Sequence, residues 1–346
     1  MLTADDIKAA HARIAGHVRR TPTLALGPET FGLGLPLAMK LEYLQVTGTF
    51  KARGAFNTLL GTAMPAAGVC AASGGNHGIA VAHAAATLGI RARIFVPEIS
   101  SPAKIARIRE TGAELVVGGA RYSDALAACE AYAADSGAYS VHAYNAFPTM
   151  AGQGTVGLEW EEDAAGGLDT VLVAVGGGGL ISGIARWFDG RVKVVGVEPE
   201  GSRALAAALA AGGPVDVDVH SVAADSLGAR NVLDHVYAVA SRHVDSVVLV
   251  PDDAIVEAQR RLWLNLRVAA EPVSPPSSPA AIGRLRASGW ACWPAAPMSI
   301  SPASQPSSER RSATAPIRDR CSGPPRVRRQ GNRATLTGRA MNRSGL

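Results

Sequence analysis

The sequence has few cysteines and no long apolar run. Its four cysteines are spread along the chain without C-x-x-C pairs or Cys/His clusters at metal-ligand spacing, so neither a disulfide framework nor a zinc site is indicated. No apolar stretch approaches the roughly 20 residues that span a bilayer, and the N-terminal segment carries acids where a signal peptide needs positive charge. We therefore expect a cytoplasmic protein with no bound metal and no contact with a membrane.

Lysine is also scarce, and the net charge of +5 is unevenly distributed. Residues 273–346 contain twelve arginines, no lysine and two acids, so residues 1–272 carry a net charge of −5. A mildly acidic body argues against nucleic acid as a partner. Pro, Ser and Arg dominate the tail and its periodicity is lost, which is typical of a disordered basic segment.

A second interpretation of the tail is a shifted reading frame in the gene. Translating the codons for residues 290–304 one base earlier can give VGVLACGANVDLAS, an apolar strand followed by a turn of small residues. One base restored after Pro272 can turn residues 271–281 into EPGLAALVARR, which suits the start of a helix. We therefore predict that residues 273–346 are a frameshift product without the organised pattern of the body.

Residues 1–272 alternate between helical and strand periodicity almost throughout. This alternation, with 47% hydrophobic and 18% charged residues, predicts an α/β fold with buried parallel sheets, whose ligands bind at the carboxyl ends of the strands. The expected strands span residues 37–43, 69–72, 92–96, 114–117, 170–175, 192–197 and 246–250. The expected helices span residues 3–18, 49–60, 76–88, 102–111, 122–136, 149–161, 180–188 and 252–266.

The first motif that carries chemistry is Thr-Gly-Thr-Phe-Lys-Ala-Arg-Gly-Ala at residues 47–55. Its lysine, Lys51, lies at the expected start of a helix, where the positive end of the peptide dipoles disfavours an ammonium charge. A neutral amine is what formation of a Schiff base requires. The alternative is an ordinary exposed lysine, but the chain has only five lysines, and Gly, Thr and Phe flank this one.

The second motif is Ala-Ser-Gly-Gly-Asn-His-Gly at residues 72–78, between an apolar strand and a helix. Backbone amides, the hydroxyl of Ser73 and the helix N-terminus together suit a carboxylate. Asn76 can donate to a phenolate oxygen. The alternative is a glycine turn in which Ser73 or Asn76 only caps the helix.

The third motif is the run of four glycines at residues 176–179, again between a strand and a helix. Such a loop lets the backbone wrap a phosphate at a helix N-terminus. The alternative is a dinucleotide site, with Glu198 at the end of the next strand. However, G-x-G-x-x-G requires a third glycine where this chain has Ile181 or Ser182, so the loop favours a monophosphate.

Together, the three motifs resemble those of the fold-type II pyridoxal-phosphate enzymes, and among them the threonine/serine dehydratases. The resemblance covers residues 1–272. It implies two lobes, each a mostly parallel sheet covered by helices, with residues 1–45 and 147–272 forming the large cofactor-binding lobe and residues 46–146 the small one. It also implies pyridoxal 5′-phosphate as cofactor, a small amino acid as substrate and a homodimer.

The resemblance also implies roles for individual residues. Lys51 would be catalytic and would hold the cofactor as a Schiff base, with Phe50 packed against the pyridine ring. The phenolic oxygen would be bound by Asn76, which would also line the substrate site. The phosphate would be held by Gly176, Gly177, Gly178, Gly179 and Leu180, and the substrate carboxylate would be surrounded by Ser73, Gly75, Asn76 and His77.

Departures from the family pattern narrow the expected activity. Relatives that make cysteine or threonine tend to show Lys-Asp-Arg and Asn-Thr-Gly where this chain has residues 51–53 and 76–78, which favours the dehydratase branch. Racemases place a serine as second base where Gly74 stands. Metal-dependent members have an aspartate where this chain has Ala204, six residues after Glu198. The polar partner of the pyridine nitrogen is found only in the shifted frame, as CGAN.

The expected reaction is therefore dehydration and deamination of threonine or serine to a 2-oxo acid and ammonia. One alternative is another β-elimination or β-replacement lyase on the same scaffold, such as a 3-hydroxyaspartate dehydratase. Another is an inactive, cofactor-binding relic, because the altered tail lacks late strands. A nucleic-acid binder acting through the tail is the least supported alternative.

Overall fold

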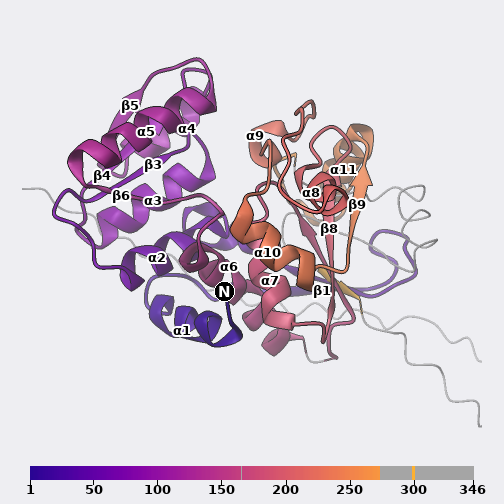
Figure 1. Cartoon of the computed structure of the whole chain (residues 1–346). Coiled ribbons are helices and arrows are strands. Elements are labelled where there is room, and N and C mark those ends of the chain that lie inside the picture. The colour runs from indigo at the N-terminus through magenta and orange to yellow at the C-terminus, as the bar shows by residue number, and fades with distance from the viewer. Residues whose placement is uncertain (165, 273–297, 301–346) are drawn as a thin grey trace, which may run out of the picture. The chain divides into compact units, whose positions relative to one another are not determined.

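The computed structural model describes residues 1–164, 166–272 and 298–300 (Figure 1). All described residues belong to one compact unit. Its strands are β1 (Thr23–Leu26), β2 (Leu37–Lys40), β3 (Val69–Ala72), β4 (Ala92–Val96), β5 (Glu114–Val117), β6 (Tyr139–Ser140), β7 (Thr170–Ala174), β8 (Lys193–Pro199), β9 (Ser246–Val250) and β10 (Met298–Ile300). Its helices are α1 (Ala4–Ile14), α2 (Lys51–Gly61), α3 (Asn76–Thr87), α4 (Pro102–Arg109), α5 (Tyr122–Ser136), α6 (Phe147–Asp163), α7 (Gly179–Phe188), α8 (Ala204–Ala211), α9 (Ala224–Leu227), α10 (Asp234–His243) and α11 (Asp252–Leu266), with short 3-10 turns at Glu42–Leu44 and Val46–Gly48.

The four-stranded sheet has the order β5-β4-β3-β6, and all its pairs are parallel. Alternate residues of its central strands enter two different cores. Ala71 and Ile94 pack with residues of α2 and α3, whereas Cys70 and Phe95 pack with Cys129 of α5. Because both faces are covered, the strands read as continuous apolar runs, as expected for a parallel sheet. Figure 1 shows α3, α4 and α5 grouped around these strands.

The six-stranded sheet has the order β1-β2-β10-β7-β8-β9. Strands β7, β8 and β9 are parallel, whereas β1 with β2, β2 with β10, and β10 with β7 are antiparallel. The predicted α/β fold with mostly parallel sheets is confirmed. The three antiparallel pairs of the six-stranded sheet depart from the predicted parallel order. Residues 298–300, within the predicted frameshift segment, form β10, and the rest of that segment lies outside the described residues, so the frameshift stays a prediction.

Helix α2, which begins at Lys51, is fixed to α6 by buried ion pairs. Arg53 is fully buried, and its guanidinium donates two hydrogen bonds of 2.8 Å to Glu42 and bonds of 2.7 and 2.8 Å to Glu159. Lys40, also fully buried, lies 3.1 Å from Glu159 and 2.8 Å from Asp163. Removing one partner of such a network leaves an uncompensated buried charge, so the first turn of α2 has one well-defined position.

Most expected elements are present, with ends shifted by a few residues. The helix expected from residue 49 begins at residue 51, because the preceding 3-10 turn places Thr47 and Gly48 at φ 65° and 82°. Strands β1 and β6 and helices α8 to α10 were not expected. All four strands of the smaller sheet fall within residues 46–146, and the division into lobes stays a prediction.

Candidate active site

Lys51 reaches from α2 to the segment between β6 and α6. Its Nζ donates a hydrogen bond of 2.9 Å to the carbonyl oxygen of Ala143. Burial lowers the pKa of the Lys51 ammonium to about 8, because the charged form loses its water. At pH 7 about a tenth of the amine is then neutral, roughly 300-fold more than at the ordinary pKa. The sequence pointed to the helix dipole as the cause, but in the structure it is desolvation.

Phe50 lies directly beside this amine. The Nζ of Lys51 is 5.2 Å from the centroid of the Phe50 ring, and the ring packs against the core of the six-stranded sheet. An aromatic face next to the reactive nitrogen suits a flat ring system bound there. The packing of Phe50 against a cofactor ring stays a prediction.

The loop at residues 73–78 leads into helix α3. The amide of Gly75 donates to Ser73 Oγ at 3.2 Å, and the first-turn amides of α3 lack acceptors within the helix, as a carboxylate site requires. The ring of His77 is turned away, because its Nε2 donates to the carbonyl oxygen of Val141 at 2.8 Å. Burial lowers the pKa of His77 to about 3. Its neutral ring therefore does not face a carboxylate, and only its backbone amide can do so.

The side chain of Asn76 binds a carboxylate from the end of the described body. Its Nδ2 donates to Glu271 Oε2 at 2.9 Å, and Ser226 Oγ donates to the same oxygen at 2.9 Å. A role for Asn76 at a phenolic oxygen stays a prediction. This role requires the side-chain amide of Asn76 to release Glu271 Oε2 and donate to the phenolic oxygen instead.

Gly74 faces a side chain from the loop before α4. A Cβ built on Gly74 would lie 2.0 Å from Oγ and 2.7 Å from Cβ of Ser100, and 2.9 Å from Cγ1 of Val96. A Cβ atom does not come this close to atoms to which it is not bonded. A serine at position 74 therefore has no room unless Ser100 moves.

The glycine run at residues 176–179 leads into helix α7. Gly178 has φ +83°, and a Cβ there would meet Val236 Cγ1 at 2.5 Å. A Cβ on Gly177 or Gly179 would lie 2.3 or 2.9 Å from atoms of Tyr144. Only glycine fits this loop, so its amides and those of the first turn of α7 are open to an anion. Leu180 is buried in the core, and only its amide can contribute.

Three residues after β6 were missed from the sequence. Tyr144 packs on the glycine loop, and its OH donates to the carbonyl oxygen of Asn231 at 3.4 Å. Asn145 Oδ1 accepts the amides of His235 and Val236 at 3.0 and 3.1 Å, at the start of α10. His142 lies beside Tyr144, with ring centroids 4.8 Å apart. The available signal was their place at the carboxyl end of a strand, where ligands of parallel sheets gather.

Glu198, the acid at the end of β8, is bound by protein amides. Its carboxylate accepts the N–H groups of Leu205 and Ala206 in α8 at 2.8 and 2.9 Å. Burial raises the pKa of Glu198 to about 7. Across the described ranges, no group of three or more His, Cys, Asp or Glu side chains could hold a metal ion. None of the described helices is both long and apolar enough to cross a membrane.

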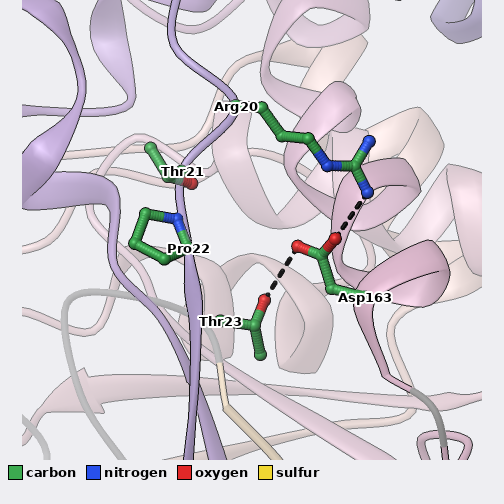
Figure 2. A pocket seen from close by; sticks show the side chains of 5 residues that line it. All are labelled: Arg20, Thr21, Pro22, Thr23 and Asp163. Carbon is green, nitrogen blue, oxygen red and sulfur yellow. Dashed lines mark hydrogen bonds and ion pairs between the residues drawn. The ribbon is translucent and has the colours of Figure 1, made fainter.

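A cavity of about 370 Å³ lies elsewhere in the fold, next to the buried ion pairs. Figure 2 shows Asp163 in its wall, bonded to Arg20 and Thr23. Lys40 binds the same carboxylate. The charges around this cavity are paired, and none of the predicted site residues lines it.

Comparisons with known proteins place the chain in a family. The model of the family "pyridoxal-phosphate dependent enzyme" matches residues 14–290. The chain belongs to this family. Phenylserine dehydratase from Ralstonia pickettii is 38% identical over 288 residues, covering 81% of this chain and 87% of the relative. L-threonine ammonia-lyase from Thermotoga maritima is 34% identical, covering 84% of this chain and 73% of that protein.

Solved structures agree with this assignment. A threonine deaminase from T.th. has a TM-score of 0.75 and 33% identity, covering 83% of this chain and 94% of its own. Maize serine racemase has a TM-score of 0.74 and 33% identity, covering 79% of this chain and 84% of its own. The fold-type II assignment and the cofactor, pyridoxal phosphate, are thus confirmed. The residues present fit this cofactor, because a loop that admits only glycine suits its phosphate and an amine of lowered pKa suits its aldehyde.

Proposed function

We propose that this enzyme dehydrates and deaminates threonine or serine to a 2-oxo acid and ammonia. The observation that carries the proposal is Lys51, whose amine is partly neutral at pH 7 and hydrogen-bonded to Ala143. The same segment, residues 141–144, contacts the glycine loop through Tyr144 and the α3 loop through the bond from His77 to Val141. Residues 141–144 therefore link the amine of Lys51 to the glycine run at residues 176–179, the candidate phosphate loop, and to residues 73–78, the candidate carboxylate loop.

Each group has a defined task in this reaction. When bound, pyridoxal phosphate withdraws electrons from the substrate's α-carbon. The amine of Lys51 takes the α-proton, because its lowered pKa leaves part of it neutral at pH 7. The amides of the first turn of α3, which begins at Asn76, orient the carboxylate. The α-proton taken by Lys51 and the departing β-hydroxide together account for the water released, and hydrolysis of the enamine that leaves the enzyme gives the 2-oxo acid and ammonia.

Racemisation is a weaker candidate, although serine racemases are among the relatives. It needs a second acid/base on the face of the substrate opposite Lys51. Gly74 has no side chain, and Ser100 fills the space beside it. A lyase that acts on 3-phenylserine or 3-hydroxyaspartate, or that adds a thiol at the β-carbon, remains an alternative within the same family.

The test is release of 2-oxo acid by the purified full-length chain. L-threonine, L-serine, 3-phenylserine and 3-hydroxyaspartate are assayed in parallel, with and without an added thiol. We expect 2-oxo acid from threonine or serine, and loss of both turnover and the absorbance at about 410 nm in Lys51→Ala. Lys8→Ala is the matched control, because that side chain is 61% exposed.

The outcomes separate the alternatives. Faster turnover of one of the larger substrates, or a thiol adduct in place of 2-oxo acid, would assign the enzyme to another lyase activity. Bound cofactor without any product would favour the inactive relic. Full turnover by Lys51→Ala would refute the role of the lysine. The homodimer and the cytoplasmic location stay predictions, testable by light scattering and fractionation.

A further inference from the structure

His142 lies in the short segment that joins β6 to α6, and its ring has a fixed orientation. Nδ1 accepts backbone N–H groups from Tyr144 at 3.2 Å and from Asn145 at 2.9 Å. A nitrogen that accepts two hydrogen bonds carries no proton, so in the neutral ring the proton is on Nε2. The edge-to-face contact with the Tyr144 ring, at an interplanar angle of 88°, holds the same orientation.

The ring of His142 is neutral whenever Lys51 can react. Burial lowers the pKa of His142 to about 4, with further contributions from the charges of Lys51 and His235. The imidazolium is therefore absent near neutral pH, and the ring cannot act as a general acid there. It offers one N–H donor, at Nε2, and within the described part of the chain no acceptor for this N–H is found.

The neighbours of His142 contact all three sequence motifs. Val141 accepts a hydrogen bond from His77 of the carboxylate loop. Ala143 accepts one from the amine of Lys51. Tyr144 packs on the glycines of the phosphate loop. His142 lies between these contacts in the chain, and the charge of Lys51 acts on its ring.

Most polar groups of a bound β-hydroxy amino acid already have partners. The carboxylate would be held by the amides at the start of α3, and the amino group would be held by the cofactor, whose phosphate would lie on the glycine loop. None of the roles assigned above to the described residues supplies a donor to the β-oxygen. We propose that the Nε2–H of His142 donates a hydrogen bond to the β-oxygen of the substrate, which rests on the proposed function.

This contact would orient the β-oxygen without transferring a proton. The C–O bond must align with the electrons left on the α-carbon for the oxygen to leave. A fixed, neutral donor holds that oxygen in one rotamer. It also selects substrates with a β-oxygen over alanine, which has a hydrogen there.

The test is the preference for serine over alanine in equilibrium binding. The Lys51→Ala variant, saturated with pyridoxal phosphate, should bind amino acids without converting them. Its dissociation constants for L-serine and L-alanine can therefore be measured by calorimetry. One neutral hydrogen bond predicts a preference of about 5-fold for serine. We expect His142→Phe to reduce this preference to near one while the affinity for alanine is unchanged. His142→Gln, whose amide can still donate, should retain part of it.

His17→Phe is the matched control, because His17 is a partly buried histidine that stacks on Phe56 at 5.1 Å. A preference that survives His142→Phe, a starting preference near one, or an equal loss of both affinities would overturn the proposal. The proposed function fails separately, if the chain with Lys51 intact forms no 2-oxo acid. A collapsed preference in that case would leave the contact from His142 established on its own.

Discussion

Replacing Lys51 with methionine should stabilise the cofactor-free protein at neutral pH. Desolvation lowers the pKa of Lys51 from 10.5 to about 8. Holding the charged form in the folded state at pH 7 therefore costs about 3 kcal/mol relative to a neutral amine. Loss of the hydrogen bond to Ala143 offsets about 2 kcal/mol of this. The net gain expected for Lys51→Met at pH 7 is about 1 kcal/mol.

The dependence of this gain on pH is the stricter part of the prediction. Lys51 has a lowered pKa in the folded state, so the unfolded chain binds more protons between about pH 8 and 10.5, and the stability of the parent rises across that window. At pH 10 the cost of the charge falls to about 1 kcal/mol. The difference in unfolding free energy between Lys51→Met and the parent should therefore decrease by about 2 kcal/mol from pH 7 to pH 10.

The assay is denaturant unfolding of the cofactor-free parent and variant at both pH values. Lys8→Met is the control, because its ammonium is mostly exposed and its replacement should change stability little at either pH. A difference between Lys51→Met and the parent that does not change with pH would refute the claim that burial lowers the pKa of Lys51. The geometry of the hydrogen bond would then be the only remaining support for a neutral amine.

Two further variants test the loop and the strand-end acid. Gly177→Ala places a methyl group 2.3 Å from a carbon of the Tyr144 ring and should weaken cofactor binding by at least about 10-fold. Gly213→Ala, with nothing within 4 Å of its Cβ, should leave the affinity unchanged. Equal affinities of the two variants in a spectral titration would contradict this. Glu198 has a raised pKa, so its folded form keeps a proton that the unfolded form loses, and stability falls as pH rises from about 4.5 to 7. Glu198→Gln should remove up to about 3 kcal/mol of this slope in unfolding curves, and an unchanged slope would show that the acid titrates normally.

The candidate site residues that the sequence predicted share one property: their signal is local. The loop at residues 73–78 and the glycine run each combine a strand end, small residues and a helix start within about ten positions. Lys51 combines small residues with a helix start that follows two 3-10 turns. The structure gives each of them that local setting. The positions of Phe50 and Ser73 also follow from short stretches of chain.

The parts that sequence reasoning missed depend on contacts between distant residues. The bond from Lys51 to Ala143 spans 92 positions, and the bond from Arg53 to Glu159 spans 106. Nothing within one helix or strand indicates such pairs. The two-residue strand β6 is too short to show periodicity, so His142 after it was not recognised. The turn of His77 toward Val141 likewise depends on a neighbour 64 positions away.

The six-stranded sheet bears on the hypothesis of a shifted reading frame. Strands β2 and β7 are both antiparallel to β10, so they run in the same direction, and a strand parallel to both could lie between them. β10 pairs with each neighbour over only three residues, although β7 has five. It lies inside residues 290–304, the segment for which the shifted frame predicts a longer apolar strand. The place between β2 and β7 is therefore occupied by the same segment, residues 290–304, for which the shifted frame predicts a strand. Sequencing the gene across codons 272 to 304 tests this, and a confirmed frame as written would reject the hypothesis.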